Sequence, residues 1–301
     1  MFKSFKEIEE YVIKGNCKKK IALAGSHDPD ALSSVVSAKR KNIINAILIG
    51  DIAKTKALLK EMDEPEDSYE FVEEPDGKKA ALYACRLVHE GNADIPMKGK
   101  VMTADFMRAI LDKQFGFIPA GGILSQATIA EYPDKNRLLI ISDCAVNISP
   151  DLGAKKKILA GAVKLAHQLG IENPKVAVIA PVEVVNPAIQ ATIDAALLAK
   201  EGDRGQITGC VIDGPLALDN ALDEEAAKSK GICGAVAGNA DVLIMPDLCT
   251  GNALTKSLHY LAHLKQSGNI TGSSIPVVMT SRTDTPEDKY YSILISVLQS
   301  L

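Results

Sequence analysis

The sequence predicts an α/β protein with two domains and mostly parallel sheets. Short runs rich in Val, Ile and Leu alternate with longer helical segments along the chain, which is typical of strands that alternate with helices. Most of the short runs are almost continuously apolar, as expected for parallel strands that are buried on both faces. The length of 301 residues exceeds what one hydrophobic core usually supports, so we expect two domains.

The predicted elements follow from this alternation. The strands are expected in the short apolar runs, at residues 21–24, 46–49, 138–142, 176–180, 208–212, 242–245 and 276–280. The helices are expected in the longer segments between them, including residues 76–89, 155–169, 188–200, 253–265 and 286–298. Neither an internal repeat nor a low-complexity linker is visible.

The composition narrows the class of protein. Apolar residues make up 47% of the chain and charged residues 24%, which is typical of a globular protein. The net charge of −4 argues against a nucleic-acid-binding protein. No segment approaches the roughly 18 apolar residues of a membrane span, and the amphipathic N-terminus is no signal peptide. Six scattered cysteines without a C-x-x-C pair indicate a reduced, cytoplasmic protein.

Ligands of parallel α/β sheets bind in the turns that follow the carboxyl ends of strands. The candidate turns are residues 142–147, 180–187, 212–221, 245–254 and 280–288, with 97–105 as a further member. In the turn at residues 280–288, Ser281, Arg282 and Asp284 stand close together in the sequence. The guanidinium of Arg282 suits phosphate oxygens, although an Arg–Asp ion pair in a solvated loop accounts for the same residues.

The residues after Asp284 have a structural explanation. Thr285 at the N-cap, Pro286 at the first helical position and Asp288 three residues after the cap resemble a capping box. Capping therefore explains Asp288 without a catalytic role. It does not explain Ser281, Arg282 or Asp284.

Three other turns carry weaker signals. Gly251 and Asn252 are expected to open a helix, where backbone N–H groups suit a phosphate, although a plain turn capped by Thr250 or Asn252 explains them as well. Asp219 precedes a helix and is expected to cap it. Lys98 follows an apolar run and either meets an anion or is simply solvated.

Cys144, in the turn SDCAVN, is either a nucleophile or a small apolar residue in a buried turn. The five histidines form no cluster with metal-ligand spacing, so we expect no metal. The chain contains neither G-x-G-x-x-G nor G-x-x-x-x-G-K-[ST], so neither dinucleotide nor P-loop chemistry is indicated.

Taken together, several of these stretches resemble the phosphate acetyl/butyryltransferase family, and most closely its phosphate butyryltransferase branch. Seven stretches match in the same order and with compatible spacing, from about residue 93 almost to the C-terminus. They are ADIPMKGKVMTADFMRAILDK, ISDCAVNISPDL, GIENPKVAVIAPVEVVNP, DRGQITGCVIDGPLALDNAL, EEAAKSKGI, ADVLIMPDLCTGNALTKSLHY and PVVMTSRTD.

The resemblance implies the reaction acyl-CoA + phosphate ⇌ acyl phosphate + CoA. It implies a fold like that of isocitrate and isopropylmalate dehydrogenases, with two α/β domains flanking a cleft: residues 1–130 with 271–301, and residues 131–270. Coenzyme A or acyl-CoA and phosphate would be substrates, with no tightly bound cofactor. We expect a homodimer or higher homo-oligomer, without a nucleic-acid or membrane partner.

The resemblance also implies roles for residues. Arg282 matches the phosphate-binding arginine of the family, and Ser281 matches the serine that hydrogen-bonds the reacting thioester. The base that takes the proton of the CoA thiol is Asp288 by the pattern of the acetyl branch and Asp284 by that of the butyryl branch. We prefer Asp284 because capping explains Asp288.

The remaining candidates are substrate-binding residues. Cys144 is expected to line the pocket, Lys98 to assist the phosphate or the CoA pyrophosphate, and Gly251, Asn252 and Asp219 to contribute from their turns. The alternatives are a phosphate acetyltransferase or a branched-chain or propionyl enzyme, a dehydrogenase of the same fold, and a CoA-binding protein without turnover. Acyl chain length, the identity of the base, the oligomeric state and the physiological direction of the reaction stay open.

Overall fold

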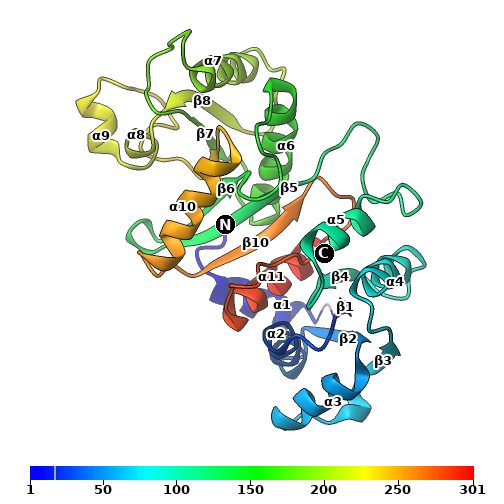
Figure 1. Cartoon of the computed structure of the whole chain (residues 1–301). Coiled ribbons are helices and arrows are strands. Elements are labelled where there is room, and N and C mark those ends of the chain that lie inside the picture. The colour runs from blue at the N-terminus through cyan, green and yellow to red at the C-terminus, as the bar shows by residue number, and fades with distance from the viewer. Residues whose placement is uncertain (17) are drawn as a thin grey trace. The chain divides into compact units, whose positions relative to one another are not determined.

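The structure is a computed structural model that describes residues 1–16 and 18–301 (Figure 1). The chain divides into two compact units. The first unit comprises Phe5–Gly122 and Ser267–Leu301, and the second comprises Met1–Ser4 and Ile123–Gln266. The units therefore change over at 122/123 and 266/267, whereas the domain boundaries expected from the sequence lie at 130/131 and 270/271.

The first unit is built on a four-stranded parallel sheet in the order β3-β2-β1-β4. Its strands are β1 (Lys19–Ala24), β2 (Ile44–Gly50), β3 (Glu70–Glu73) and β4 (Ile95–Lys98). In the register, Ile21 of β1 lies opposite Ala46 of β2 on one side and Ile95 of β4 on the other. Since all three are buried, the centre of the sheet is apolar on both sides of β1.

The described residues of the first unit, 5–16, 18–122 and 267–301, form six α-helices. They are α1 (Phe5–Gly15), α2 (Pro29–Arg40), α3 (Ile52–Glu61), α4 (Gly77–His89), α5 (Thr103–Ile110) and α11 (Pro286–Gln299), joined by the short 3₁₀ helix Glu66–Ser68. The N-caps of α2, α3 and α4 are aspartates, each of which accepts a backbone N–H of its helix. Strand β10 (Gln266–Thr271) begins at the unit boundary.

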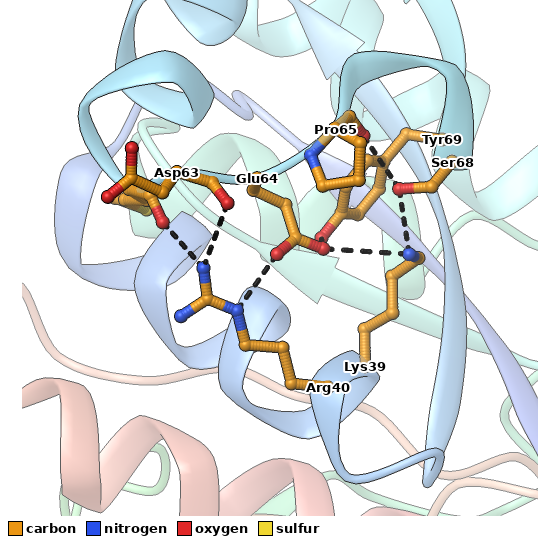
Figure 2. Close-up of polar contacts among 8 residues, drawn as sticks. Lys39, Arg40, Asp63, Glu64, Pro65, Ser68 and Tyr69 are labelled. Carbon is orange, nitrogen blue, oxygen red and sulfur yellow. Dashed lines mark hydrogen bonds and ion pairs between the residues drawn. The ribbon is translucent and has the colours of Figure 1, made fainter.

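A cluster of polar side chains connects the end of α2 to the segment before β3, the edge strand of this sheet (Figure 2). The almost buried Glu64 side chain accepts a hydrogen bond from Nε of Arg40 at 2.9 Å and another from the hydroxyl of Tyr69 at 2.9 Å. Nζ of Lys39 lies 3.6 Å from Glu64 and donates to the hydroxyl of Ser68 at 2.8 Å. The end of α2 is thereby tied to the segment that leads into β3, which holds this short edge strand in register.

The second unit contains a mixed sheet with strands in the order β5-β6-β9-β7-β8. These are β5 (Ser125–Tyr132), β6 (Arg137–Ser142), β7 (Lys175–Ile179), β8 (Val211–Leu216) and β9 (Val242–Ile244). β5 and β6 form an antiparallel hairpin, and the other pairs are parallel. The hairpin turns through the 3₁₀ helix Pro133–Lys135 and Asn136, whose φ of 49° is a conformation that Asn tolerates.

The helices of the second unit connect these strands. They are α6 (Leu152–Gln168), α7 (Gln190–Asp203), α8 (Leu218–Leu222), α9 (Glu224–Ser229) and α10 (Leu248–Tyr260). A core cluster joins Ile141, Leu216 and Leu243 of the strands to Ala221 of α8. In residues 1–16 and 18–301, no helix has both the length and the apolar character needed to cross a membrane.

The predicted α/β class with mostly parallel sheets is confirmed, but several elements differ. β3, β4, β5 and β10 were not expected, since they are short or carry many polar residues. The strand expected at 208–212 lies later, as β8. The strand expected at 276–280 is only a single parallel bridge between Val278 and Met97. The helix expected at 253–265 begins at Leu248 and ends at Tyr260.

Candidate active site

Three segments of the first unit run in parallel and end at the same edge. β1 and β4 pair in parallel up to Ala24 and Lys98. The segment before Ser281 lies beside β4, because Lys98 N–H donates to Val278 O at 2.9 Å and Val278 N–H to Pro96 O at 3.1 Å. The turns at 25–28, 99–102 and 281–285 therefore follow the carboxyl ends of neighbouring segments. This is the edge at which α/β sheets bind ligands.

Two of these turns touch through their backbones. Gly99 N–H donates to Ala24 O at 2.8 Å, and Lys100 N–H donates to Gly25 O at 2.9 Å. Gly25 has a φ of +72°, and a Cβ added there would lie 2.7 Å from the backbone nitrogen of Lys100. A Cβ at Gly99 would lie 2.5 Å from Gly25 O. Both positions need glycine so that the two turns can approach this closely.

The 281–284 turn is closed by its own side chains. Ser281 N–H donates to the Asp284 carboxylate at 2.7 Å, and Thr283 N–H donates to Oγ of Ser281 at 3.4 Å. The turn therefore presents the exposed side chain of Arg282 from a backbone that is hydrogen-bonded on both sides of it.

Two buried lysines hold this turn at its ends. Nζ of Lys98, which is 3% exposed, donates to Thr280 O at 3.3 Å, and Nζ of Lys289, which is 2% exposed, donates to Asp284 O. Burial lowers the pKa of Lys98, and the carboxylates of Asp28 and Asp284 oppose this effect. Two buried ammonium groups beside a guanidinium make this edge suited to an anion.

The capping box expected at the start of α11 is present. The hydroxyl of Thr285 accepts the N–H of Asp288 at 3.1 Å, and the Asp288 carboxylate accepts the N–H of Thr285 at 3.1 Å and its hydroxyl at 2.7 Å. Asp288 is buried, whereas Asp284 is half-buried. Both carboxylates thus accept backbone N–H groups, so capping alone does not distinguish them.

A cavity of about 280 Å³ opens beside Arg282. Its lining comes from all three turns and consists of Asp28, Gly99, Lys100, Val101, Met102 and Arg282. Nη2 of Arg282 lies 3.0 Å from the thioether sulfur of Met102. Of the carboxylates in residues 1–16 and 18–301, none forms an ion pair with Arg282, so the loop ion pair considered from the sequence is absent from this part of the chain.

In the second unit, Cys144 lies in a tightly bonded turn after β6. The buried Asp143 carboxylate accepts the backbone N–H groups of Ala145, Val146 and Asn147 at 2.9–3.1 Å. Cys144 is 1% exposed, and its thiol donates to Ile141 O. Burial raises the pKa of this thiol to about 12, and the charge of Asp143 acts in the same direction. The thiol is therefore protonated at neutral pH, unlike a catalytic cysteine.

The expected helix start at Gly251 and Asn252 is wrong. α10 begins at Leu248, and Asp247 caps it by accepting the N–H of Thr250 at 2.8 Å. Gly251 instead lies within the first turn, where a Cβ would overlap the carbonyl oxygen of Asp143. Nδ2 of Asn252 donates to Cys144 O at 3.3 Å. These two residues therefore pack against the Cys144 turn.

Asp219 does not cap α8, because Ala217 occupies the N-cap position. Its carboxylate accepts the N–H of Asn220 at 2.8 Å and pairs with Nζ of Lys230 at 2.9 Å. The hydrogen bond from Lys230 lowers the pKa of Asp219. The structure thus places Asp219 in a half-exposed ion pair.

Comparison with known proteins assigns the chain to a family. The family model described as "Phosphate acetyl/butaryl transferase" matches residues 68–297. The chain belongs to this family. A phosphate butyryltransferase of Clostridium acetobutylicum is 47% identical over 298 residues, which are 99% of this chain and 98% of that protein. A phosphate acetyltransferase of Thermotoga maritima is 40% identical over 280 residues, 93% of this chain and 95% of that protein.

Solved structures agree with this membership of the phosphate acetyl/butaryl transferase family. A branched-chain phosphotransacylase from Enterococcus faecalis V583 has a TM-score of 0.83 at 29% identity, over 93% of this chain and 98% of that one. A putative 4-hydroxythreonine-4-phosphate dehydrogenase from Salmonella typhimurium has a TM-score of 0.57 at 13% identity, over 93% of this chain and 99% of that one. The second match concerns the fold alone and confirms its dehydrogenase-like character.

The structure brings Ser281, Arg282, Asp284, Asp288 and Lys98 together in the first unit of this family member. Cys144, Gly251 and Asn252 meet at one turn of the second unit, and Asp219 lies in its own ion pair. No group of three His, Cys, Asp or Glu side chains that could hold a metal ion occurs within residues 1–16 and 18–301.

Sequence reasoning missed Asp28, Lys100 and Met102 in the cavity and Asp143 beneath the Cys144 turn. A signal existed for Asp28, since GSHDPD directly follows the strand expected at 21–24 and reads as a turn with an N-cap and a proline at N1. For Lys100 and Met102 the turn 97–105 was recognised, but only its Lys98 was singled out.

The contact of Gly251 with the Cys144 turn gives a stability prediction. Gly251→Ala should lower the free energy of unfolding by about 1–3 kcal/mol, because the new methyl group overlaps the carbonyl oxygen of Asp143. Gly153→Ala, early in α6, is the matched control. Its Cβ would meet only Asp151 at 3.4 Å, so its stability should stay the same or rise slightly. Urea unfolding of both variants measures the difference, and equal stabilities would contradict the packing argument.

Proposed function

We propose that this chain is a phosphate acyltransferase that interconverts a short-chain acyl-CoA, butyryl or similar, and phosphate with acyl phosphate and CoA. The observation that carries the proposal is the 281–284 turn: a guanidinium on a tightly bonded backbone, beside buried Lys98 and an aspartate. The full-length similarity to a phosphate butyryltransferase supports it. Coenzyme A is then a substrate, and no tightly bound cofactor is required.

The proposed roles follow from the charge that develops during the reaction. Attack of phosphate on a thioester passes through a tetrahedral anion, which needs an anion site and a hydrogen-bond donor. We assign the phosphate to Arg282, with help from Lys98, and the hydrogen bond to the thioester to Ser281. In the reverse direction the CoA thiol must lose its proton, and a free cysteine thiol, with a pKa of about 8.5, is mostly protonated at neutral pH, so Asp284 or Asp288 acts as base.

The residues of the second unit receive supporting roles. Cys144 lines a substrate pocket together with Asn252 and Gly251, and Asp219 contributes through its ion pair with Lys230. We further propose a cytoplasmic enzyme that works as a homodimer or larger homo-oligomer. Light scattering of the purified protein tests the oligomeric state.

The acyl group is the open part of the proposal. The similar proteins include a phosphate acetyltransferase and a branched-chain phosphotransacylase, so acetyl, propionyl and branched acyl groups are the second candidates. Release of CoA from a panel of acyl-CoAs, measured with and without phosphate, tests the reaction and ranks the acyl groups. Absence of phosphate-dependent release with every acyl-CoA would refute the proposed function.

We expect Cys144→Ala to keep most of the activity. The thiol is buried and its pKa is about 12, so it is a poor nucleophile, and transfer should occur directly in a ternary complex. Initial rates with CoA and acyl phosphate varied together should give intersecting lines. Parallel lines, or an acyl group trapped on Cys144, would instead establish a covalent mechanism.

A further inference from the structure

The cavity beside Arg282 is lined by both charged and apolar side chains. Arg282, Lys100 and Asp28 supply the charges, and Val101 and Met102 supply apolar side chains. Its volume of about 280 Å³ lies at the lower end of the roughly 300–1,000 Å³ typical of ligand pockets. This size suits a small ligand with an anionic head and a short aliphatic tail and is too small for a whole nucleotide-bearing thioester.

Met102 occupies a position that the helix itself does not explain. It is the N-cap of α5, where Ser, Thr, Asp or Asn are preferred, and it makes no side-chain capping bond. Its side chain is 58% exposed, although it is large and apolar. Methionine at this position neither caps the helix nor contributes to stability by being buried. Helix stability therefore does not explain why a methionine stands here, in the lining of the cavity.

The apolar Met102 and the charged Arg282 of the lining are in direct contact. The thioether sulfur lies 3.0 Å from Nη2 of Arg282. A phosphoryl group bound to this guanidinium would therefore carry its acyl substituent within reach of the Met102 side chain. Methionine is flexible and polarizable, so it packs against aliphatic groups of different shapes.

We propose that Met102, together with Val101, forms the acyl-group subsite and sets the acyl preference for short straight or branched aliphatic chains. This inference rests on the proposed function and names the part of the substrate that the cavity selects. The phosphoryl end is held by Arg282, and the acyl end covers the exposed thioether of Met102. Val101 is buried, with 5% of its surface exposed, so its side chain is fixed by packing. The exposed side chain of Met102 can change its conformation to fit different acyl groups.

The test measures kcat/KM of the full-length protein for acetyl-, propionyl-, butyryl-, isobutyryl- and valeryl-CoA at saturating phosphate. Met102→Ala should lower the preference for butyryl- over acetyl-CoA by roughly 10-fold, since one or two methylene contacts are lost in an apolar subsite. Met102→Phe should reduce the rates with valeryl- and isobutyryl-CoA most, because the ring fills the space for the tail.

Two further variants separate the acyl contact from other effects. Met102→Leu keeps the apolar volume and removes the sulfur, so the acyl profile should stay as in the wild type. Leu111→Ala changes an exposed apolar residue at the other end of α5, outside the cavity, and should also leave the profile unchanged. Neither Met102→Ala nor Met102→Leu removes a capping bond, so both variants should fold, and thermal melts measure whether they do.

The outcomes distinguish this inference from the proposed function. If the wild type shows phosphate-dependent CoA release and both Met102→Ala and Met102→Phe keep the wild-type acyl ratios, the acyl subsite is refuted and the function stands. If Met102→Ala lowers the rates with all acyl-CoAs equally, Met102 acts only through Arg282, and the subsite is again refuted. If the wild type is inactive with every acyl-CoA, both proposals fall together.

Discussion

Asp284→Asn is expected to lower kcat for phosphate-dependent acyl transfer by about 10²–10⁴, the usual loss when a general base is removed. The asparagine side-chain oxygen can still accept the N–H of Ser281, which Asp284 accepts at 2.7 Å, so the turn should keep its conformation. The substitution should therefore slow the chemical step and change the thermal stability little. Steady-state kinetics in the direction of acyl-CoA formation, where the thiol must be deprotonated, give the clearest measurement.

Asp288→Asn is the matched comparison. The carboxylate of Asp288 accepts the N–H and hydroxyl of Thr285, so the substitution should lower the free energy of unfolding by about 0.5–1 kcal/mol and spare most of the activity. The opposite pattern, with a large loss of kcat in Asp288→Asn and a small loss of kcat in Asp284→Asn, would assign the catalytic role to Asp288.

Arg282→Ala should raise the KM for phosphate and lower kcat, with a combined loss of about 10- to 150-fold in kcat/KM. This corresponds to about 1.5–3 kcal/mol, typical of one charge-assisted contact to an anion. The guanidinium is exposed and lies beside the neutral thioether of Met102, so it is accessible to phosphate. Arg282→Lys should recover part of the loss, because it keeps the charge without the planar fork.

Arg108→Ala is the control for a general change in charge. Arg108 lies on α5 of the same unit and pairs with the half-buried Asp105, away from the cavity lining. Its removal should leave the phosphate KM unchanged. A phosphate KM in Arg282→Ala that equals the wild-type value would refute the assignment of phosphate to Arg282.

Local patterns were the most predictable part of the structure. The capping box of Thr285 and Asp288 depends on residues three positions apart, and the structure contains it as expected. The strands β1, β2, β6, β7 and β9 are buried apolar runs, for which hydrophobicity is a direct signal.

Features that depend on distant segments were not predictable. Asp28 and Arg282 line one cavity although they are far apart in the chain, and only the parallel arrangement of β1, β4 and the segment at Val278 brings them together. The strand β10, with the sequence QSGNIT, carries little hydrophobic signal of its own. Tertiary pairing decides such elements, so propensity alone misses them.

The choice between Asp284 and Asp288 shows the limit of reasoning by elimination. From the sequence, capping explained Asp288 and left Asp284 for catalysis. In the structure, Asp284 also accepts a backbone N–H, that of Ser281, in a turn which no short pattern announces. Both carboxylates therefore have structural roles, and the kinetics of Asp284→Asn and Asp288→Asn separate their catalytic roles.

The contact between Gly25 and Gly99 constrains how far this enzyme can be diversified by mutagenesis. At positions 25 and 99 the two turns meet through their main chains, because any larger residue at either position would collide with the opposite turn. In a saturation library that includes positions 25 and 99, most variants would carry a side chain that prevents these two turns from packing together. Met102 is an exposed side-chain position in the lining of the cavity, so a library aimed at new acyl groups gains its useful variation there.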